Sequence, residues 1–572
     1  MEPDNNSIMT NKPEPDTPKA ESTDRPESFS ELPPLYLGGP RPIQQPPRGQ
    51  SRFFNLLFKA SLLYALVFAF CVYDNTKGLL LGVVAAATVI YCRYAEKKEG
   101  IAPKHDKFWY EFLLVLLGIS CGLTDNDYII FFNLVGMVVT LFAMLIHDFY
   151  EDSTWTLPKY FAQFFKLLEG IIAGISGFFY DAIATHRSDD EPGKKKTGTY
   201  ILLGLLIAAP LLAIIIVLLS SADFVFQSLL KDMFRFSFAT CVLVLITFSV
   251  GFFASYACLR AFLTRTQEVQ IKDSQRFEPV IAITVLSVIS VVYLVFSGIQ
   301  IAYLFIGNMT LPGKYTYAEY AREGFFQLLV VCILNLILVL FTLARFGEHP
   351  ALKGLLCLIS ACTYIMLASS ALRMVMYIDV YYLTRKRVLV LWGLALIAIL
   401  LIGIIVQIFK KNFPLLRYGM IVCALCYLVL SFGRMDYWIA EYNTKMILTS
   451  PEHALEAEGK LNADQKNSLS YLSVLSADAA PVIFEYEAQD ELADATVFFP
   501  IMTSSTPVSL VAVKEDPDWV SEYKGNIGSV REDSYRQWNL SRFTAKTLLG
   551  DEKTGSGSRT TARMRKEINT KE

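Results

Sequence analysis

Long apolar runs dominate this chain of 572 residues and limit what it can fold into. A helix that spans a bilayer needs about 20 predominantly apolar residues, and most of the runs reach or approach that length. The mean hydropathy of +0.38 agrees with this pattern. We therefore predict an all-α polytopic membrane protein with about eleven transmembrane helices. The runs cover residues 53–73, 78–94, 108–123, 128–147, 199–220, 236–259, 279–305, 325–344, 354–372, 388–409 and 416–433.

Polar segments flank this transmembrane domain, which we place at residues 52–435. Residues 1–51 hold 11 of the 24 prolines and many acidic residues and serines, so we expect a disordered cytoplasmic tail. Residues 436–550 contain no spanning run and have helical patterns, which predicts a small, mostly helical C-terminal region. Residues 551–572 are rich in Gly, Ser, Thr and basic residues, which is typical of a flexible tail.

Residues 159–185 differ from the other apolar segments. Large apolar residues recur there every three to four positions, and Lys166, Glu169 and Asp181 interrupt them. This amphipathic pattern predicts a helix lying flat at the membrane interface. With the N-terminus inside, most flanking Lys and Arg then fall on the inner side, as cytoplasmic flanks require. The odd number of crossings makes the C-terminal region extracytoplasmic, and a crossing by residues 159–185 would reverse every later orientation.

Composition and motifs exclude several classes of protein. The net charge of −2 gives no general attraction to nucleic acid. All ten Cys lie in or beside apolar runs, which argues against a disulfide framework and suits a bacterial envelope protein. The five His show no metal-ligand spacing, and we find no phosphate loop, zinc motif or nucleophile elbow. We expect no metal, no cofactor and no nucleic acid, with membrane lipids as partners and protein partners left open.

Charged and aromatic residues gather at the predicted outer ends of the helices. A charge at membrane depth is costly unless it is paired or hydrated, so several charges on one face predict a polar pocket or ion-pair network beneath the C-terminal region. The alternative is that they form only structural ion pairs at helix ends. The candidate residues are Asp223, Arg322, Glu323, Arg373, Tyr377, Asp379, Arg385 and Arg434.

The predicted connection from Arg373 to Arg387 breaks the rule that positive flanks lie inside. One interpretation is a re-entrant segment shielded by protein. The favoured interpretation is an interfacial helix, with Tyr377, Tyr381 and Tyr382 in the aromatic belt and basic residues on lipid phosphates.

Four other polar positions have a favoured structural interpretation. Asn335 is expected to make an interhelical hydrogen bond. Asp478 is expected to cap the next helix rather than act as an acid. Trp538 and Asn539 are expected to dock against the membrane domain.

Several short segments resemble a bacterial membrane family catalogued as domain of unknown function 4173, which is related to number 4153. They are Ser221–Asp223, Ala321–Leu328, Arg373–Tyr377, Tyr382–Arg387, Ile439–Asn443, Leu475–Pro481 and Trp538–Ser541. The resemblance runs from about residue 199 to 550 and implies that the outer polar segments and the C-terminal region form one unit. Tyr382 stands where such a family is expected to have Gly, which predicts a less tight turn.

Two classes of function follow. The first is a non-enzymatic protein of the cell membrane, for transport, conduction or envelope assembly, that uses the outer polar pocket; it is favoured because no catalytic motif is found. The second is a membrane enzyme acting on a lipid-linked or envelope substrate, with Asp223, Glu323 or Asp379 as acid or base. A sensor with an outer ligand-binding region is a weaker alternative, so enzymatic activity stays open.

Overall fold

The structure, a computed structural model, describes most of the apolar segments and part of the C-terminal region. The described ranges are 51–188, 238–264, 277–302, 325–449, 463–493, 518–529 and 537–553, apart from a few single positions, with scattered residues between 204 and 223. The predicted tail at residues 1–51 lies outside these ranges except for Ser51. The same holds for the predicted tail at residues 551–572, except for the end of the last helix.

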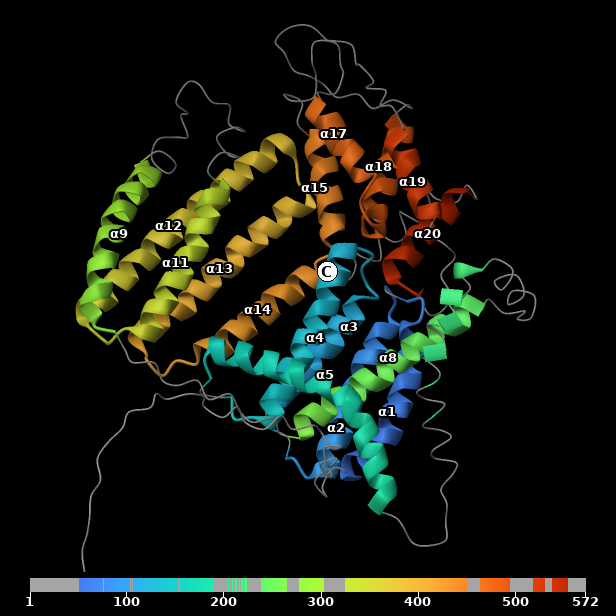
Figure 1. Ribbon diagram of the computed structural model, residues 1–572. Helices are drawn as coiled ribbons and strands as arrows, with labels where there is room; N and C mark the ends of the chain where they lie inside the picture. The colour runs from blue at the N-terminus through green and yellow to red at the C-terminus, as the bar shows by residue number, and fades with distance from the viewer. Residues whose placement is uncertain are drawn as a thin grey trace, which may run out of the picture. The chain divides into compact units, whose positions relative to one another are not determined.

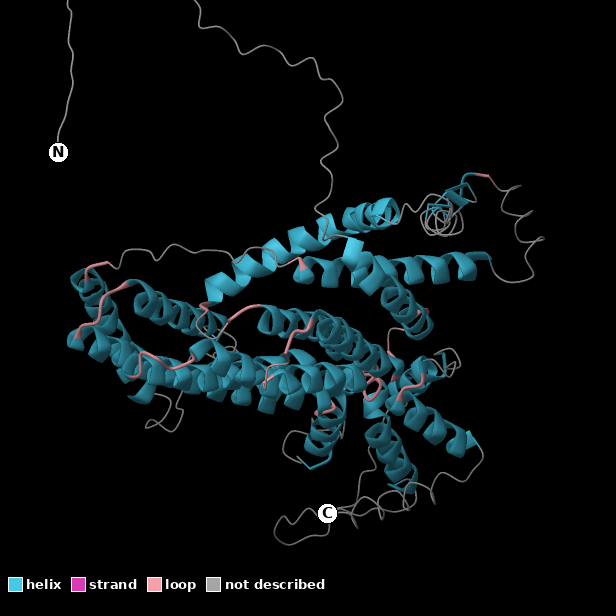
Figure 2. Cartoon of the chain, turned by 90° about the horizontal axis from the view of Figure 1, so that it is seen from below, coloured by secondary structure: helices cyan, strands magenta, loops and turns pink. Residues whose placement is uncertain are grey.

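Helices make up nearly all of the described chain, and the described residues contain no named strand (Figures 1 and 2). The all-α prediction is confirmed for these residues. The helices before the C-terminal region are α1 (Ser51–Val72), α2 (Leu80–Glu99), α3 (Lys107–Ser120), α4 (Asp127–Phe149), α5 (Leu157–Ser188), α8 (Phe238–Leu263), α9 (Pro279–Gln300), α11 (Phe325–Arg345), α12 (Pro350–Tyr381), α13 (Arg385–Phe409) and α14 (Leu415–Phe432).

Nine helices in the described ranges are long and apolar enough to cross a membrane: α1, α4, α5, α8, α9, α11, α12, α13 and α14. The chain is therefore a multi-pass membrane protein. α2 and α3 are not among the nine; α3 has 14 residues and is about 21 Å long at 1.5 Å per residue. The run 199–220 lies mostly outside the described residues. The count of eleven crossings stays a prediction.

The helices pack in two groups (Figure 1). In the first, α8 packs against α1 and α5, while α1, α2, α3 and α4 pack in sequence. In the second, α12 packs against α9, α11 and α13. Each group has its own apolar core. α14 packs on α13 and also on α3 and α4, so it joins the two groups.

A buried hydrogen-bond network fixes α14 to the first group. Asn133 of α4 accepts hydrogen bonds from the hydroxyls of Tyr427 and Ser431, both at 2.7 Å. The Ser431 hydroxyl also lies 2.6 Å from the hydroxyl of Ser120 on α3. Asn335 makes a similar link in the second group, because it donates to Thr363 at 2.9 Å and accepts from Tyr293 at 2.6 Å. The interhelical role predicted for Asn335 is confirmed.

α5 is one continuous helix of 32 residues over the segment predicted to lie at the interface. Its buried residues Leu167, Phe178 and Ala182 pack in the core with α1 and α8. On α5, Asp181 is fully buried and accepts hydrogen bonds from Arg260 at 2.6 Å and Tyr256 at 2.8 Å. The flat placement of this helix stays a prediction, since its length and composition also permit a crossing.

The connection predicted between Arg373 and Arg387 is shorter than expected. α12 continues as a regular helix to Tyr381, and only three residues separate it from α13. The re-entrant interpretation and the favoured interpretation of a separate interfacial helix are therefore both wrong for residues 373–381, which form the last turns of α12. Tyr382 has φ 62° and ψ 179°, a conformation that is essentially restricted to Gly. The expectation of a looser turn is also wrong, because Tyr382 itself adopts the backbone shape of the expected Gly.

The described part of the C-terminal region consists of short helices around its own apolar core. They are α15 (Met435–Thr449), α17 (Ala463–Leu472), the 3-10 helix η2 (Ala477–Ala479), α18 (Ala480–Ala493), α19 (Asp518–Ser529) and α20 (Leu540–Lys553). Tyr382 and the start of α13 pack against this core. The helices are therefore packed onto the membrane domain rather than separated from it by a linker.

Candidate functional site: a buried polar joint

Asp436, in the first turn of α15, is a fully buried carboxylate. The Arg385 guanidinium donates to both of its oxygens, at 2.8 and 2.6 Å. The Asn126 side chain donates at 2.9 Å, and the Ser476 backbone N–H donates at 3.0 Å. A buried charge is tolerated when it is paired and its remaining lone pairs are satisfied. Asp436 thus ties together the α3–α4 loop, the start of α13 and the segment before η2.

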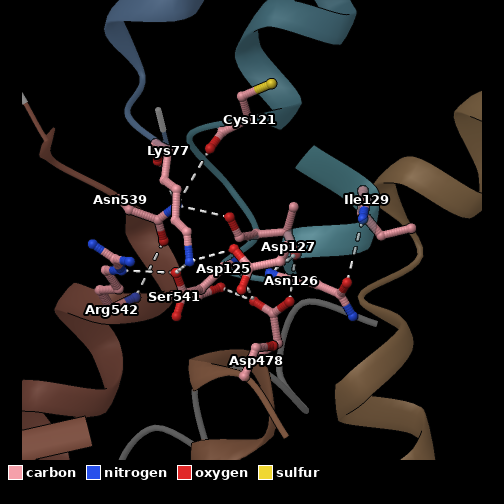
Figure 3. Close-up of polar contacts among 12 residues, drawn as sticks. Lys77, Cys121, Asp125, Asn126, Asp127, Ile129, Asp478, Asn539, Ser541 and Arg542 are labelled. Atoms are coloured by element: carbon pink, nitrogen blue, oxygen red, sulfur yellow. Dashed lines mark hydrogen bonds and ion pairs between the residues drawn. The ribbon is translucent and has the colours of Figure 1, made fainter. Parts of the chain in front are cut away.

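Asp478 of η2 is a second fully buried carboxylate (Figure 3). It accepts hydrogen bonds from the hydroxyls of Thr124 and Ser541 and a longer one, at 3.4 Å, from the Asp125 backbone N–H. Burial raises the pKa of Asp478, although the hydroxyls of Ser541 and Thr124 act in the opposite direction. The capping role predicted for Asp478 is wrong, because its recorded side-chain partners lie on the α3–α4 loop and on α20.

Asn539 completes the attachment from the last helix (Figure 3). Its buried side-chain amide donates to the backbone carbonyls of Thr124 at 2.7 Å, Lys77 at 2.9 Å and Cys121 at 3.3 Å. The backbone adds two further bonds, from Leu79 N–H to the Trp538 carbonyl at 3.1 Å and from Leu540 N–H to the Gly122 carbonyl at 2.9 Å. The predicted docking of Trp538 and Asn539 against the membrane domain is confirmed.

Charged residues form a more accessible rim around these contacts. Lys77 lies 2.6 Å from Asp127 and 3.4 Å from Asp125. Arg542 donates to Asp125 at 2.7 Å. We call the buried residues Thr124, Asn126, Asp436, Asp478, Asn539 and Ser541, together with the half-buried Arg385, the outer joint. The name refers to the face on which the sequence analysis places these loops.

The outer joint restricts the path of the chain through the membrane. Asn126 directly precedes α4 and Arg385 begins α13, and both bond to Asp436, so these two helix ends lie on one side. Between them lie six of the eleven predicted spans, which give an even number of crossings: 128–147, 199–220, 236–259, 279–305, 325–344 and 354–372. A return to the same side needs an even number. α5 therefore cannot simply be added as a further crossing to the eleven predicted spans.

The described residues of the predicted pocket divide among several contacts. Arg385 belongs to the outer joint, and Arg434 lies at its edge, 3.5 Å from the carbonyl of Asp478. Tyr377 packs under the guanidinium of Arg387, which lies 4.4 Å from its ring centre. Asp379 accepts a hydrogen bond of 3.4 Å from Tyr442 of α15.

The other predicted pocket residues are not among these contacts. Arg373 is buried and donates to Gln300 of α9 at 3.3 Å, and Gln300 also accepts from Ser369. Asp223 is exposed, and its backbone N–H donates to Leu219. Arg322 and Glu323 lie outside the described residues. A single pocket that contains all eight residues stays a prediction.

Comparison with known families matches residues 112–486 to the model described as Domain of unknown function (DUF4153). The match covers more than half of the chain. The chain belongs to this family. The predicted relation to number 4153 is confirmed, whereas membership of number 4173 stays a prediction. No curated protein and no solved structure matches the chain.

The DUF4153 match includes both buried carboxylates of the outer joint but not Lys77 or the segment from Trp538 to Arg542. Asp436 and Asp478 are thus part of the family domain, while α20 adds contacts from beyond it. Sequence reasoning missed Asp478 as a joint residue. The sequence signal that could have indicated its role is the polar loop Thr124–Asp127, which lies on the same predicted face and supplies partners of Asp478.

A second cluster of buried charged residues consists of Glu96, Lys107, Glu111 and Asp148, and we call it the inner network. Asp148 lies within the DUF4153 match, and the other three residues lie just before it. The Lys107 ammonium at the start of α3 lies 2.8 Å from Asp148 and also contacts Glu96 and, at 3.9 Å, Glu111. Glu111 in turn accepts from Arg93 at 2.7 Å. Lys107 and the three carboxylates are all buried. Lys107 is therefore the buried cation shared by all three carboxylates.

The pKa values of two carboxylates in and near the inner network, Glu96 and Asp152, are shifted in opposite directions. Burial raises the pKa of Glu96, which lies beyond the apolar run of α2, to about 7, and the Lys107 ammonium only partly offsets this. Burial would also raise the pKa of Asp152, but hydrogen bonds from His147 and Tyr160 outweigh it and lower that pKa. Glu96 therefore stays protonated to a higher pH than an ordinary glutamate, and Asp152 stays charged to a lower pH than an ordinary aspartate.

Proposed function

We propose that this DUF4153 protein is a non-enzymatic, multi-pass protein of the cell membrane that acts in envelope assembly. In this proposal, the C-terminal helices are held at the outer face as a rigid platform for envelope partners. The observation that supports it is that the buried polar contacts of the outer joint connect the C-terminal helices to the membrane domain. Asp436 and Asp478 are both fully buried and bonded to segments far apart in sequence.

The chemistry of these carboxylates favours attachment over catalysis. A general acid or base must reach the proton it transfers, either directly or through one water molecule. Asp436 already accepts four hydrogen bonds, from Arg385, Asn126 and Ser476. A carboxylate with its oxygens occupied in this way is suited to fixing the position of a domain.

A complementation experiment tests the proposal. The host strain that lacks the gene receives Asn539→Ala, which removes three hydrogen bonds to the loops around α2, α3 and α4 but leaves both buried carboxylates in place. We expect the variant to reach the membrane at normal level and to fail to restore growth under envelope stress. Proteolysis of the C-terminal region in membranes, measured in parallel, should be faster than in the unaltered protein.

Asp127→Ala is the matched control, because this carboxylate contacts the same loops but is 77% exposed. It should complement fully, since an exposed ion pair contributes little. Full complementation by an Asn539→Ala protein with a released C-terminal region would contradict the platform function.

Transport is the second candidate, and the inner network is the observation that favours it. Ionisable residues buried near the membrane commonly mark ion or proton pathways, and three carboxylates share Lys107 here. The test is proton flux into vesicles that contain the purified protein and carry a pH gradient. Transport predicts a flux that Glu96→Gln reduces, and flux equal to that of empty vesicles would exclude proton transport.

A further inference from the structure

Exposed apolar side chains cluster at the start of α20. Trp538, Leu540 and Phe543 are 39%, 42% and 56% exposed, and the rings of Trp538 and Phe543 lie 6.3 Å apart. Further along the same helix Thr547 is half-buried, and the exposed position is Gly550, which has no side chain. The apolar exposure of α20 is thus confined to the end that contacts the membrane domain.

Backbone hydrogen bonds fix the position of the start of α20 along the axes of the predicted spanning helices. Trp538 is bonded to Leu79, and Leu540 is bonded to Gly122. Leu79 and Gly122 lie at the ends of the apolar runs 78–94 and 108–123. The ends of apolar runs lie where the hydrocarbon of the bilayer gives way to headgroups. The predicted spans 78–94 and 108–123 therefore place Trp538 and Leu540 at headgroup level.

Neighbouring elements carry exposed aromatic residues at corresponding positions. Tyr128, in the first turn of α4, is 54% exposed, and Trp438, in the first turn after α14, is 61% exposed. Trp and Tyr are enriched at the membrane–water interface because their rings are amphipathic. The start of α20 thus resembles the starts of α4 and α15, where aromatic side chains are also exposed.

We propose that residues 538–543, which lead into α20 and form its first turn, insert into the adjacent lipid leaflet through Trp538, Leu540 and Phe543. Lipid is the occupant favoured here, because Trp538 is bonded to Leu79 at the end of the predicted span 78–94, where Leu79 and Val83 are 37% and 46% exposed. The C-terminal region would then be attached twice, to protein through the outer joint and to lipid through α20. This inference does not depend on the proposed envelope function.

Site-specific photocrosslinking tests the insertion. A benzophenone amino acid is placed at Phe543 in the full chain, which is reconstituted in nanodiscs of phosphatidylethanolamine and phosphatidylglycerol. Val138, which is 53% exposed on α4, is the lipid-facing control, and Thr547 is the control further along α20. Lipid adducts are identified by mass spectrometry after irradiation.

We expect lipid adducts at position 543 comparable to those at 138, and about tenfold fewer at 547. Absence of lipid adducts at 543, while 138 gives them, would overturn the proposal. Adducts at 543 to another protein or to a second copy of the chain, without lipid adducts, would overturn it as well. The same probe at Leu540 gives an independent result if the change at 543 disturbs folding.

Discussion

The outer joint and the inner network both bury carboxylates, but they satisfy them in different ways. In the inner network one ammonium, that of Lys107, serves Glu96, Asp148 and Glu111. In the outer joint, Asp436 has a guanidinium of its own, and Asp478 accepts from hydroxyls and a backbone N–H. In the inner network Lys107 is the buried cation for all three carboxylates and Arg93 adds a bond to Glu111 alone, whereas the outer joint distributes its contacts over many donors. The outer joint should therefore tolerate single losses better.

The largest effect is expected from Lys107→Met, which removes the shared cation. Glu96 and Asp148 would then lose their buried cation while Glu111 keeps Arg93, and loss of one partner from a buried ion pair costs about 3–5 kcal/mol. Chemical denaturation in detergent micelles, followed with a thiol-reactive dye, measures the change through the buried Cys71, Cys92 and Cys121.

Lys353→Met is the matched control, because Lys353 lies 3.0 Å from Glu348 and both are well exposed. Its cost should stay below about 1 kcal/mol. Equal stability of Lys107→Met and Lys353→Met would mean that the inner network contributes no more than a surface ion pair.

Asp436→Ala should have the next largest effect. It leaves the Arg385 guanidinium without its carboxylate and costs about 3–4 kcal/mol. The same denaturation experiment measures it, with Asp127→Ala as the exposed control. A cost as small as that of Asp127→Ala would show that Asp436 does not hold the outer joint.

A smaller effect is expected at Tyr382, in the turn next to the outer joint. Both Tyr382→Gly and Tyr382→Ala remove the ring, so their difference isolates the backbone. A non-Gly residue in this conformation costs about 1–3 kcal/mol, so the Gly variant should be the more stable by about that amount. Elsewhere Ala is usually the more stabilising of the two. Greater stability of the Ala variant would refute the strained turn.

Dependence on pH should separate Asp478 from Asp152. The pKa of Asp478 is raised from its ordinary 3.8, so the folded state binds the proton more tightly. The stability from this group is complete below the ordinary value and is lost as pH rises through the folded value. The pKa of Asp152 is lowered, so its contribution is lost as pH falls through the folded value.

The thermal midpoint, measured between about pH 4 and 8, tests this difference. Asp478→Asn cannot ionise, so the advantage of the unaltered protein over it should shrink as pH rises. The advantage over Asp152→Asn should instead grow. An advantage over Asp478→Asn that grows with pH would contradict the raised pKa.

Sequence predicted the parts of the fold that depend on local apolar content. The described spanning helices lie close to the predicted runs, because about 20 apolar residues in a row have few alternatives in a bilayer. It also predicted the role of Asn335, since an amide within an apolar helix needs a partner from a neighbouring helix. The expectation of Gly at Tyr382 identified the position of a real backbone constraint.

The outer joint could not be predicted to the same degree. Asp436 pairs with Arg385, and Asp478 pairs with Thr124 and Ser541, so the partners lie tens to hundreds of residues apart. Charge alone placed Arg373 and Arg385 in one group, but the structure gives them different partners on different helices. Such pairings depend on how the helices pack, which the apolar pattern does not specify.

The central claim is that the C-terminal helices are held on the membrane domain by the contacts of the outer joint rather than by chain continuity alone. A protease site inserted between α15 and α17 of an N-terminally tagged chain tests it most directly. After cleavage in detergent, the fragment containing η2, α18, α19 and α20 should remain bound during purification on the tag. Asn539→Ala should weaken this retention. Complete separation of the fragment from the otherwise unaltered chain would contradict the account.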